Sequence, residues 1–210
     1  VEHYCSVVLL CCFGLSAQNI SEIEKDLKLA GSLKHPIEIR IYYGGGITNY
    51  SSLFRMYKTD KNIWQAVFYE HFDEVLGHRG KSILRTKKKK ISSKNDMKHV
   101  YKNLLRSYIL ELPSIETIQW KLKKRGEVER IEYKRKGEKN VEYETVSSQV
   151  AFLDGQIYTV QIQSKPWKKK HTFTYDNPES YLKHFPEIDE IIYMNEILNI
   201  IKNEFDIWKE

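Results

Sequence analysis

The stretch Ile37-Glu38-Ile39-Arg40-Ile41-Tyr42-Tyr43 alternates apolar and polar side chains over residues 37–43. Side chains of a strand point alternately to opposite faces, so this two-residue period predicts a strand with one face in the core and the other half-buried. Gly44-Gly45-Gly46 follows and predicts the end of the strand in a flexible hairpin connection. We therefore expect the fold to be organised around a β-sheet that starts here.

Three more strands are expected downstream of this stretch. Residues 50–58 and 63–72 flank the polar sequence Thr59-Asp60-Lys61-Asn62, which has the composition of a hairpin turn. The segment 63–72 is apolar on both faces and is typical of a central strand. A more polar strand over 81–91 closes the predicted sheet.

Helices are predicted on either side of these strands. Ile20, Ile23, Leu27 and Ala30 recur at helical spacing before Gly31. A longer apolar stripe runs from Met97 to Leu112 and ends at Pro113. The first half of the chain thus reads as a helix, four strands and a helix.

A similar order returns after residue 113. We expect a short helix at 115–122, strands at 128–135, 140–146, 150–152, 156–163 and 171–175, and a long C-terminal helix whose apolar face runs from Ile188 to Trp208. Consecutive hairpins imply antiparallel pairing. The fold class is therefore predicted to be α+β, with two antiparallel meander sheets or one continuous sheet, helices packed on one face, and an α-β4-α pseudo-repeat divided into 18–112 and 113–210.

The first seventeen residues have the pattern of an export signal. Val7-Val8-Leu9-Leu10-Cys11-Cys12-Phe13 is a short apolar core, and Gly14-Leu15-Ser16-Ala17 supplies the small residues that precede a cleavage site. This ending resembles the signal sequences of secreted bacterial proteins, a resemblance that identifies a sorting signal and implies no function. We expect a truncated leader at 1–17, cleavage between Ala17 and Gln18, and a periplasmic or secreted protein.

All three cysteines lie in this leader, at Cys5, Cys11 and Cys12. Acylation at Cys11 or Cys12 would give a lipid-anchored protein, although Leu10 and Cys11 are poor matches to the small residue expected before an acylated cysteine. The mature domain is then expected to be free of cysteine, so neither disulfides nor thiolate metal sites contribute to it.

The charge of the chain is basic, at +6 with histidine neutral, and Glu2 is the single charged residue of the leader. Removing the leader therefore leaves +7 on 193 residues, enough chain to bury roughly 70% of the unfolded surface. Such a balance favours polyanionic partners such as lipopolysaccharide phosphates, acidic glycans or extracellular nucleic acid, and it is equally common in proteins that are merely soluble. An envelope polyanion, a glycan or a protein is the expected partner, and no integral membrane span is expected after the signal.

Two lysine-rich runs are candidate polyanion sites. One consists of Lys87, Lys88, Lys89 and Lys90, and the other of Trp167 followed by Lys168, Lys169 and Lys170. A tryptophan beside lysines can stack on a sugar or base while the ammonium groups bind anions. The alternative is that lysines on an edge strand prevent edge-to-edge pairing of sheets.

The segment Glu70-His71-Phe72-Asp73-Glu74 holds the densest set of titratable side chains. On a strand His71 and Asp73 share a face, so His71 with Asp73 or Glu74 is a candidate acid-base pair for a hydrolase of unfamiliar type. Their spacing matches no metalloenzyme motif, and neither a metal nor another cofactor is expected.

The sequence carries none of the familiar hydrolase, Walker or dinucleotide fingerprints. Its 14 tyrosines, by contrast, include Tyr42, Tyr43, Tyr50, Tyr57 and Tyr69 in the first predicted sheet. Such side chains either stabilise the sheet through cross-strand pairs or line a binding groove. The expected function is a non-enzymatic binding or interaction module that uses an aromatic sheet face or a basic edge, with the hydrolase as the alternative.

Overall fold

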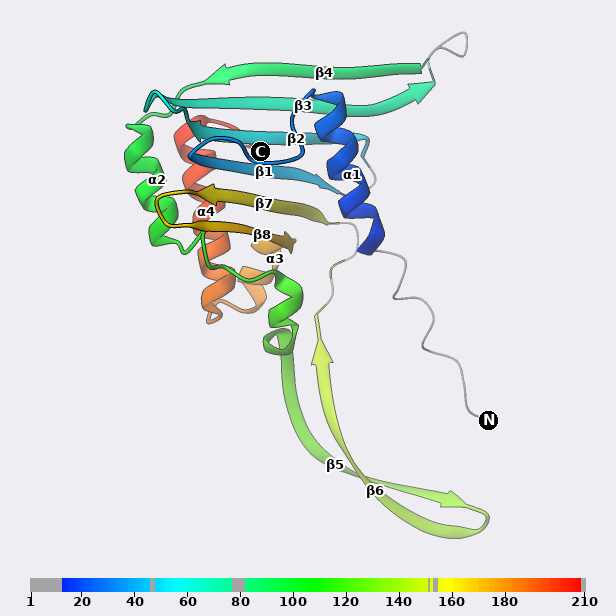
Figure 1. Cartoon of the computed structure of the whole chain (residues 1–210). Coiled ribbons are helices and arrows are strands. Elements are labelled where there is room, and N and C mark those ends of the chain that lie inside the picture. The colour runs from blue at the N-terminus through cyan, green and yellow to red at the C-terminus, as the bar shows by residue number, and fades with distance from the viewer. Residues whose placement is uncertain (1–12, 46–47, 77–81, 151, 153–154, 209–210) are drawn as a thin grey trace.

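The computed structural model of the whole chain describes residues 13–45, 48–76, 82–150, 152 and 155–208 (Figure 1). Its elements follow the order α1 (Phe13–Asp26), β1 (Ile37–Gly45), β2 (Tyr50–Lys58), β3 (Trp64–Leu76), β4 (Ser82–Ile91), α2 (Met97–Arg106), the 3-10 helix η1 (Ile115–Leu122), β5 (Lys123–Arg135), β6 (Glu138–Gln149), β7 (Gln156–Ser164), β8 (Lys169–Asp176), α3 (Pro178–His184) and α4 (Asp189–Phe205).

One continuous antiparallel sheet forms the body, with the strand order β4-β3-β2-β1-β7-β8. Strand β1 lies in its middle, where Ile41 is opposite Phe54 on β2 and opposite Val160 on β7. The α+β prediction is confirmed: six strands from both sequence halves share one antiparallel sheet, and β5 and β6 form a second, smaller one. The two sequence halves both contribute to the six-stranded sheet, because β7 pairs with β1.

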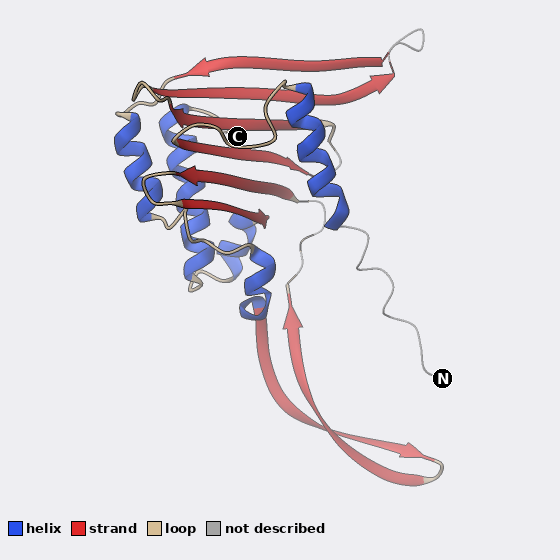
Figure 2. Ribbon diagram, viewed as in Figure 1, coloured by secondary structure: helices blue, strands red, loops and turns tan. Residues whose placement is uncertain are grey.

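Helices cover the two faces of the sheet unequally. Helices α2, α3 and α4 lie behind the sheet in Figures 1 and 2, and the large core cluster on that side contains Ile39, Leu104 and Ile197, all with no exposed surface. Helix α1 crosses the opposite face, where Ile23 packs with Leu53 in a smaller cluster. The sheet is therefore covered mainly by helices on one face, as expected, and by one helix on the other.

The second face of β1 differs from the half-buried surface that its sequence predicts. Glu38 is fully buried and Arg40 is 1% exposed, because α1 and the loop that follows it cover them. Arg40 Nη1 donates to Glu24 Oε1 on α1 at 2.7 Å and to the Ala30 carbonyl oxygen at 2.7 Å, while its Nε donates to Glu38 Oε1 at 3.0 Å. Paired and hydrogen-bonded in this way, the charges can stay inside the protein.

Glu38 is the second centre of this network. Burial by itself would raise the pKa of its carboxyl, but the backbone N–H groups of Lys34 and His35 and the guanidinium groups of Arg55 and Arg40 hold the pKa below its ordinary value. The ionised Glu38 carboxylate therefore stabilises the folded protein at pH values above the ordinary carboxyl pKa. This stabilisation is lost as the pH falls through the lowered pKa of the folded state.

Two helices end before their apolar stripes do. Helix α2 stops at Arg106 instead of Leu112, because Tyr108 takes a left-handed φ of 56°. Helix α4 stops at Phe205, because Asp206 is left-handed with a φ of 52°. Leu112 and Trp208 still pack against the core from outside the helices, which is why the apolar spacing continued past the helix ends.

The expected hairpin between 150–152 and 156–163 is wrong. Val150 and Phe152 belong to no strand and instead pack against the main core, while β7 takes β1 and β8 as neighbours. Asp154 lies outside the described residues. Pairing with β1 satisfies the free edge of the central strand, which a local hairpin would have left open.

Strands β5 and β6 form a separate two-stranded hairpin that projects from the body (Figure 1). Their pairing, including Ile131 opposite Glu142, confirms the strands predicted at 128–135 and 140–146. We call this hairpin the arm.

Replacing Arg40 by Met should destabilise the protein by about 3–5 kcal/mol, because Glu24 and Glu38 would keep buried charges without their shared partner. Arg55→Met is the matched control: it also removes a 2.9 Å contact to Glu38, but from a side chain at the border of solvent, and should cost about 1.5 kcal/mol. Urea unfolding measures both free energies. Equal losses would contradict a central role for Arg40.

Candidate ligand-binding cleft

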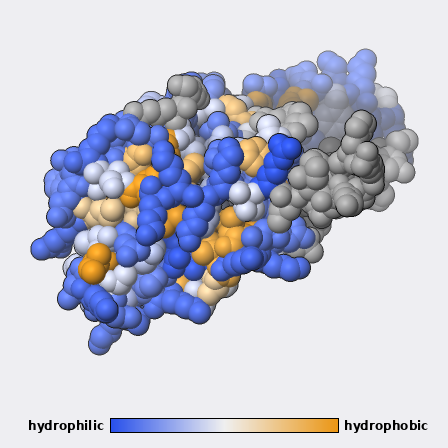
Figure 3. All heavy atoms as spheres, turned by 90° about the horizontal axis from the view of Figure 1, so that it is seen from above, coloured by the Kyte–Doolittle hydropathy of each residue, from blue (hydrophilic) through white to orange (hydrophobic). Residues whose placement is uncertain are grey.

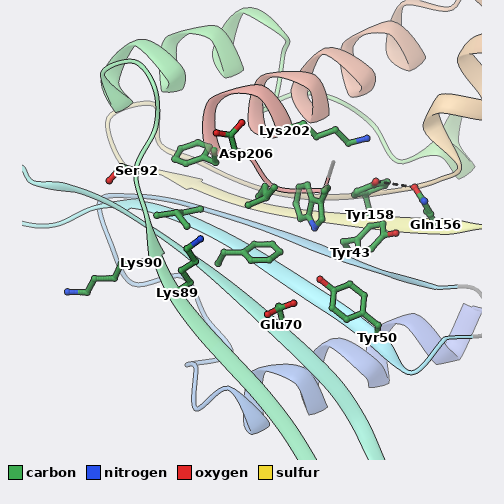
Figure 4. A pocket seen from close by; sticks show the side chains of 15 residues that line it. Tyr43, Tyr50, Glu70, Lys89, Lys90, Ser92, Gln156, Tyr158, Lys202 and Asp206 are labelled. Carbon is green, nitrogen blue, oxygen red and sulfur yellow. Dashed lines mark hydrogen bonds between the residues drawn. The ribbon is translucent and has the colours of Figure 1, made fainter. Parts of the chain in front are cut away.

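A cleft of about 730 Å³ lies on the helix-covered face of the sheet (Figure 4). Residues from β1, β2, β3, β4 and β7 form one wall, and the end of α4 with residues 206–208 forms the other. Segments from both sequence halves are therefore required to build it.

The floor of the cleft is aromatic and centres on Trp208. Its ring lies 5.8 Å from the ring of Tyr43, 6.0 Å from that of Phe68 and 5.9 Å from that of Tyr158, measured between centroids. Its Nε1 donates a 2.8 Å hydrogen bond to Ser52 Oγ on β2. The four rings and this bond fix the position of the chain after α4 on the sheet.

The chain reaches this position by turning sharply after α4. Asp206 and Trp208 both have φ near 52°, in the left-handed region. Aspartate tolerates this region better than most residues, whereas a bulky side chain there is uncommon and must be held by its packing. No glycine or proline marks the turn. The apolar spacing therefore predicts that Trp208 lies on the helix, and it does not reveal Trp208 as a residue of the cleft.

Three charged groups of the rim already have counter-ions. Lys202 on α4 pairs with Glu179, Asp206 Oδ1 lies 3.1 Å from Lys94 Nζ, and Glu70 Oε2 lies 3.4 Å from Lys87 Nζ. These exposed or half-exposed pairs contribute little to stability. They do reduce the charge that these groups present to a ligand.

Lys89 and Lys90 on β4 differ from those three groups. Within the described part of the chain, no carboxylate oxygen lies within 4.0 Å of either Nζ atom. The side chain of Lys89 extends toward the cavity in Figure 4 and that of Lys90 points away from it. Seen onto the β4 edge, much of the surface is hydrophilic (Figure 3). Lys89 therefore gives the cleft a positive charge that none of the described carboxylates neutralises.

Tyr50 stands opposite this edge, with Tyr43 and Tyr158 nearby in Figure 4. Burial raises the pKa of its phenol, and an interaction with Ser52 partly opposes that effect. The hydroxyl therefore stays protonated at neutral pH and can donate as well as accept a hydrogen bond. At the same end of the cleft, Tyr158 donates to Gln156 Oε1 at 3.2 Å.

The two predicted lysine runs do not form one site. Lys87, Lys88, Lys89 and Lys90 lie on β4, whereas Lys169 and Lys170 open β8, and these strands are opposite edges of the sheet. Trp167 and Lys168 lie in the turn before β8, with Trp167 57% exposed. Of the two runs, the one on β4 borders the cleft.

His71 lies on the α1 side of the sheet, away from the cleft. It is 2% exposed; its Nδ1 is 3.1 Å from Ser51 Oγ and its Nε2 is 2.9 Å from Asp26 Oδ2 on α1. Asp73 Oδ1 is more distant, 3.7 Å from Nδ1. The side chain of Glu74 lies outside the described residues.

Ser51, His71 and Asp26 thus form a chain of hydrogen bonds that the sequence did not indicate, because Asp26 comes from α1. A nucleophilic serine must reach a substrate, yet Ser51 is only 5% exposed. The chain joins α1 to β2 and β3 and is explained by that structural role.

The described residues contain neither a cluster of metal ligands nor a membrane-spanning helix. There, no three His, Cys, Asp or Glu side chains gather as metal ligands. The same residues include no helix with the length and apolarity needed to cross a bilayer.

Trp208→Ala should destabilise the protein by about 2–3 kcal/mol and open the floor of the cleft, because it removes a large ring from four aromatic contacts. Trp120→Ala is the control, since this ring is 67% exposed, and its effect should stay within about 0.5 kcal/mol. Thermal unfolding followed by circular dichroism compares them. Similar stabilities would show that residues after α4 are not anchored by Trp208.

No known protein family, curated protein or solved structure matches this chain. Its function must be inferred from the geometry and charge of the cleft.

Proposed function

We propose that this protein is an exported, non-enzymatic binding module that holds an acidic glycan in the cleft. The observation that carries the proposal is the meeting of an aromatic floor with Lys89, whose side chain extends toward the cavity and lacks a carboxylate partner in the described structure. Aromatic faces stack on the apolar face of a sugar ring. Ammonium groups and a phenol at the rim bind its carboxylate, sulfate or phosphate groups and its hydroxyls.

The shape and size of the site support this ligand class. A volume of about 730 Å³ lies within the range of small-molecule sites, so the cleft can hold a few sugar rings. The acidic rim groups Glu70 and Asp206 have lysine neighbours at 3.4 and 3.1 Å, which leaves the β4 edge as the dominant charge. An anionic ligand is therefore favoured over a cationic one.

Binding fits this geometry better than the alternative of hydrolysis. The expected acid-base histidine, His71, faces α1 and is buried, while the cleft-facing residues of β3 are Phe68 and Glu70. General acid-base catalysis needs the titratable group within reach of the substrate. The cleft lining contains one carboxylate from β3 and one from the end of α4, each with a lysine neighbour.

Lys89→Gln/Lys90→Gln should weaken binding of a heparin-derived hexasaccharide at least tenfold, because the charge of Lys89 that faces the cavity and the adjacent charge of Lys90 on the same edge are removed. Titration calorimetry at fixed ionic strength measures the Kd. Lys168→Gln/Lys169→Gln is the matched control: it removes the same charge from the opposite sheet edge and should change the Kd less than threefold.

Two results would overturn the acidic-glycan proposal. One is equal weakening by both double variants, which would mean that net charge alone attracts the probe. The other is that the unmodified protein binds a neutral hexasaccharide of glucose as tightly as the acidic one, which would assign binding to the aromatic floor alone.

Export is the second part of the proposal, and α1 is compatible with it. This helix runs through the proposed cleavage bond between Ala17 and Gln18. Its described contacts with the sheet come from later residues, including Ile23, Glu24 and Asp26. Cleavage would therefore leave the contacts that hold the rest of α1 in place.

In a bacterial host that secretes the protein, the mature chain should begin at Gln18 and contain no cysteine. Mass spectrometry of the purified N-terminal peptide measures this. An acylated Cys11 or Cys12 would replace the proposal by a lipid anchor, and an intact chain in the cytosol would refute export.

A further inference from the structure

The arm is the most exposed part of the described structure. Nine large hydrophobic side chains are exposed among the described residues, and five of them lie on β5 and β6: Val128, Ile131, Val141, Tyr143 and Val146. A two-stranded hairpin is marginally stable in water unless further strands or a helix cover it. The arm therefore carries apolar surface that the body of the protein leaves uncovered.

Strand β5 also has an unpaired edge. In the part of the chain that the structure describes, its partner in the sheet is β6 alone, although β5 spans 13 residues. A long free edge presents a row of N–H and C=O groups that can pair with another strand. Edge pairing would extend the arm from two strands to more and remove the instability of an isolated hairpin.

The charges of β5 alternate in blocks along the strand. Residues 123–125 at its start are basic, Glu127, Glu129 and Glu132 follow, and Lys134 and Arg135 lie at its end. In an antiparallel pair of identical strands, the start of each strand lies opposite the end of the other. Full overlap of two β5 strands would place the basic start of each opposite the basic end of the other, whereas a shifted register that overlaps residues 127–135 places acidic side chains opposite basic ones.

We propose that β5 of one copy pairs antiparallel with β5 of a second copy, with the two Ile131 residues facing each other at the two-fold axis. This register places Glu127 opposite Arg135 of the partner and Arg130 opposite Glu132 of the partner. Each of these pairs occurs twice, so no like charges of β5 lie directly opposite each other. The product is a four-stranded antiparallel ribbon, which closes as a dimer because the interface is self-complementary.

The edge strand β4 of the body has a charge pattern that opposes pairing with its own copy. Lys87, Lys88, Lys89 and Lys90 are consecutive and exposed on that edge. Any self-pairing of β4 would place lysines beside lysines, and such repulsion blocks edge-to-edge association. The β4 and β5 edges thus differ in charge pattern: β4 repels its own copy, whereas residues 127–135 of β5 match theirs in the proposed register.

Cross-linking tests the register directly, in the full chain with Cys5, Cys11 and Cys12 replaced by Ser. Ile131→Cys should form a disulfide-linked dimer on mild oxidation, because the two side chains face each other at the axis. Val141→Cys is the matched control: it is similarly exposed but lies on β6, the outer strand of the ribbon, and should stay monomeric on a non-reducing gel.

Charge reversal tests the complementarity, with sedimentation velocity as the measurement of dimer dissociation. Glu127→Lys/Glu129→Lys and Lys134→Glu/Arg135→Glu should each weaken the dimer at least tenfold. Mixing the two double variants should restore association as a heterodimer, because the reversed halves again have opposite charges. Circular dichroism of each variant verifies that the body remains folded.

A monomeric unmodified protein at high micromolar concentration would overturn the proposal. A dimer that survives both charge reversals, or that cross-links equally through position 141, would also overturn it by placing the interface elsewhere. The proposal does not depend on glycan binding, since the cleft and the arm share no residue.

Discussion

The buried guanidinium of Arg40 is the interaction on which the arrangement of the protein depends. It sits on the middle strand of the sheet and joins Glu24 of α1, Glu38 of β1 and the loop after α1. Without it, two carboxylates would be buried beneath α1 with fewer partners, and burying unpaired charge is costly. The network therefore fixes α1 on one face and commits the other face of β1 to the large apolar core.

This division gives the two faces of the sheet different roles. The α1 face holds polar contacts that are satisfied internally, including the hydrogen bonds of His71 to Ser51 and Asp26. The opposite face is apolar under α2 and α4, and it widens into the cleft where the chain after α4 returns to the sheet. His71 on the first face stabilises the fold, whereas Tyr43 and Tyr50 on the second are partly exposed at the cleft.

The strand edges determine how the molecule meets other molecules. The lysines of β4 keep that edge from pairing with another sheet and, at the same time, supply charge to the cleft beside it. The arm extends from the body with an edge whose charges change sign along its length. One edge thus borders the cleft of the proposed anionic ligand, and the other is the edge through which we propose that a second copy of the chain pairs.

Local pattern alone determined the strands from β1 to β8, the α+β class and the segments that carry lysine and tyrosine, because alternation and turn composition act over a few residues. Sequence could not determine that β7 pairs with β1, that Glu24 neutralises Arg40, or that Trp208 lies beyond the end of α4 and forms the floor of the cleft. Those features depend on contacts between residues far apart in the chain, where burial and pairing outweigh local preference. Tertiary structure therefore decided which face of the sheet carries the cleft and which histidine lies inside the core.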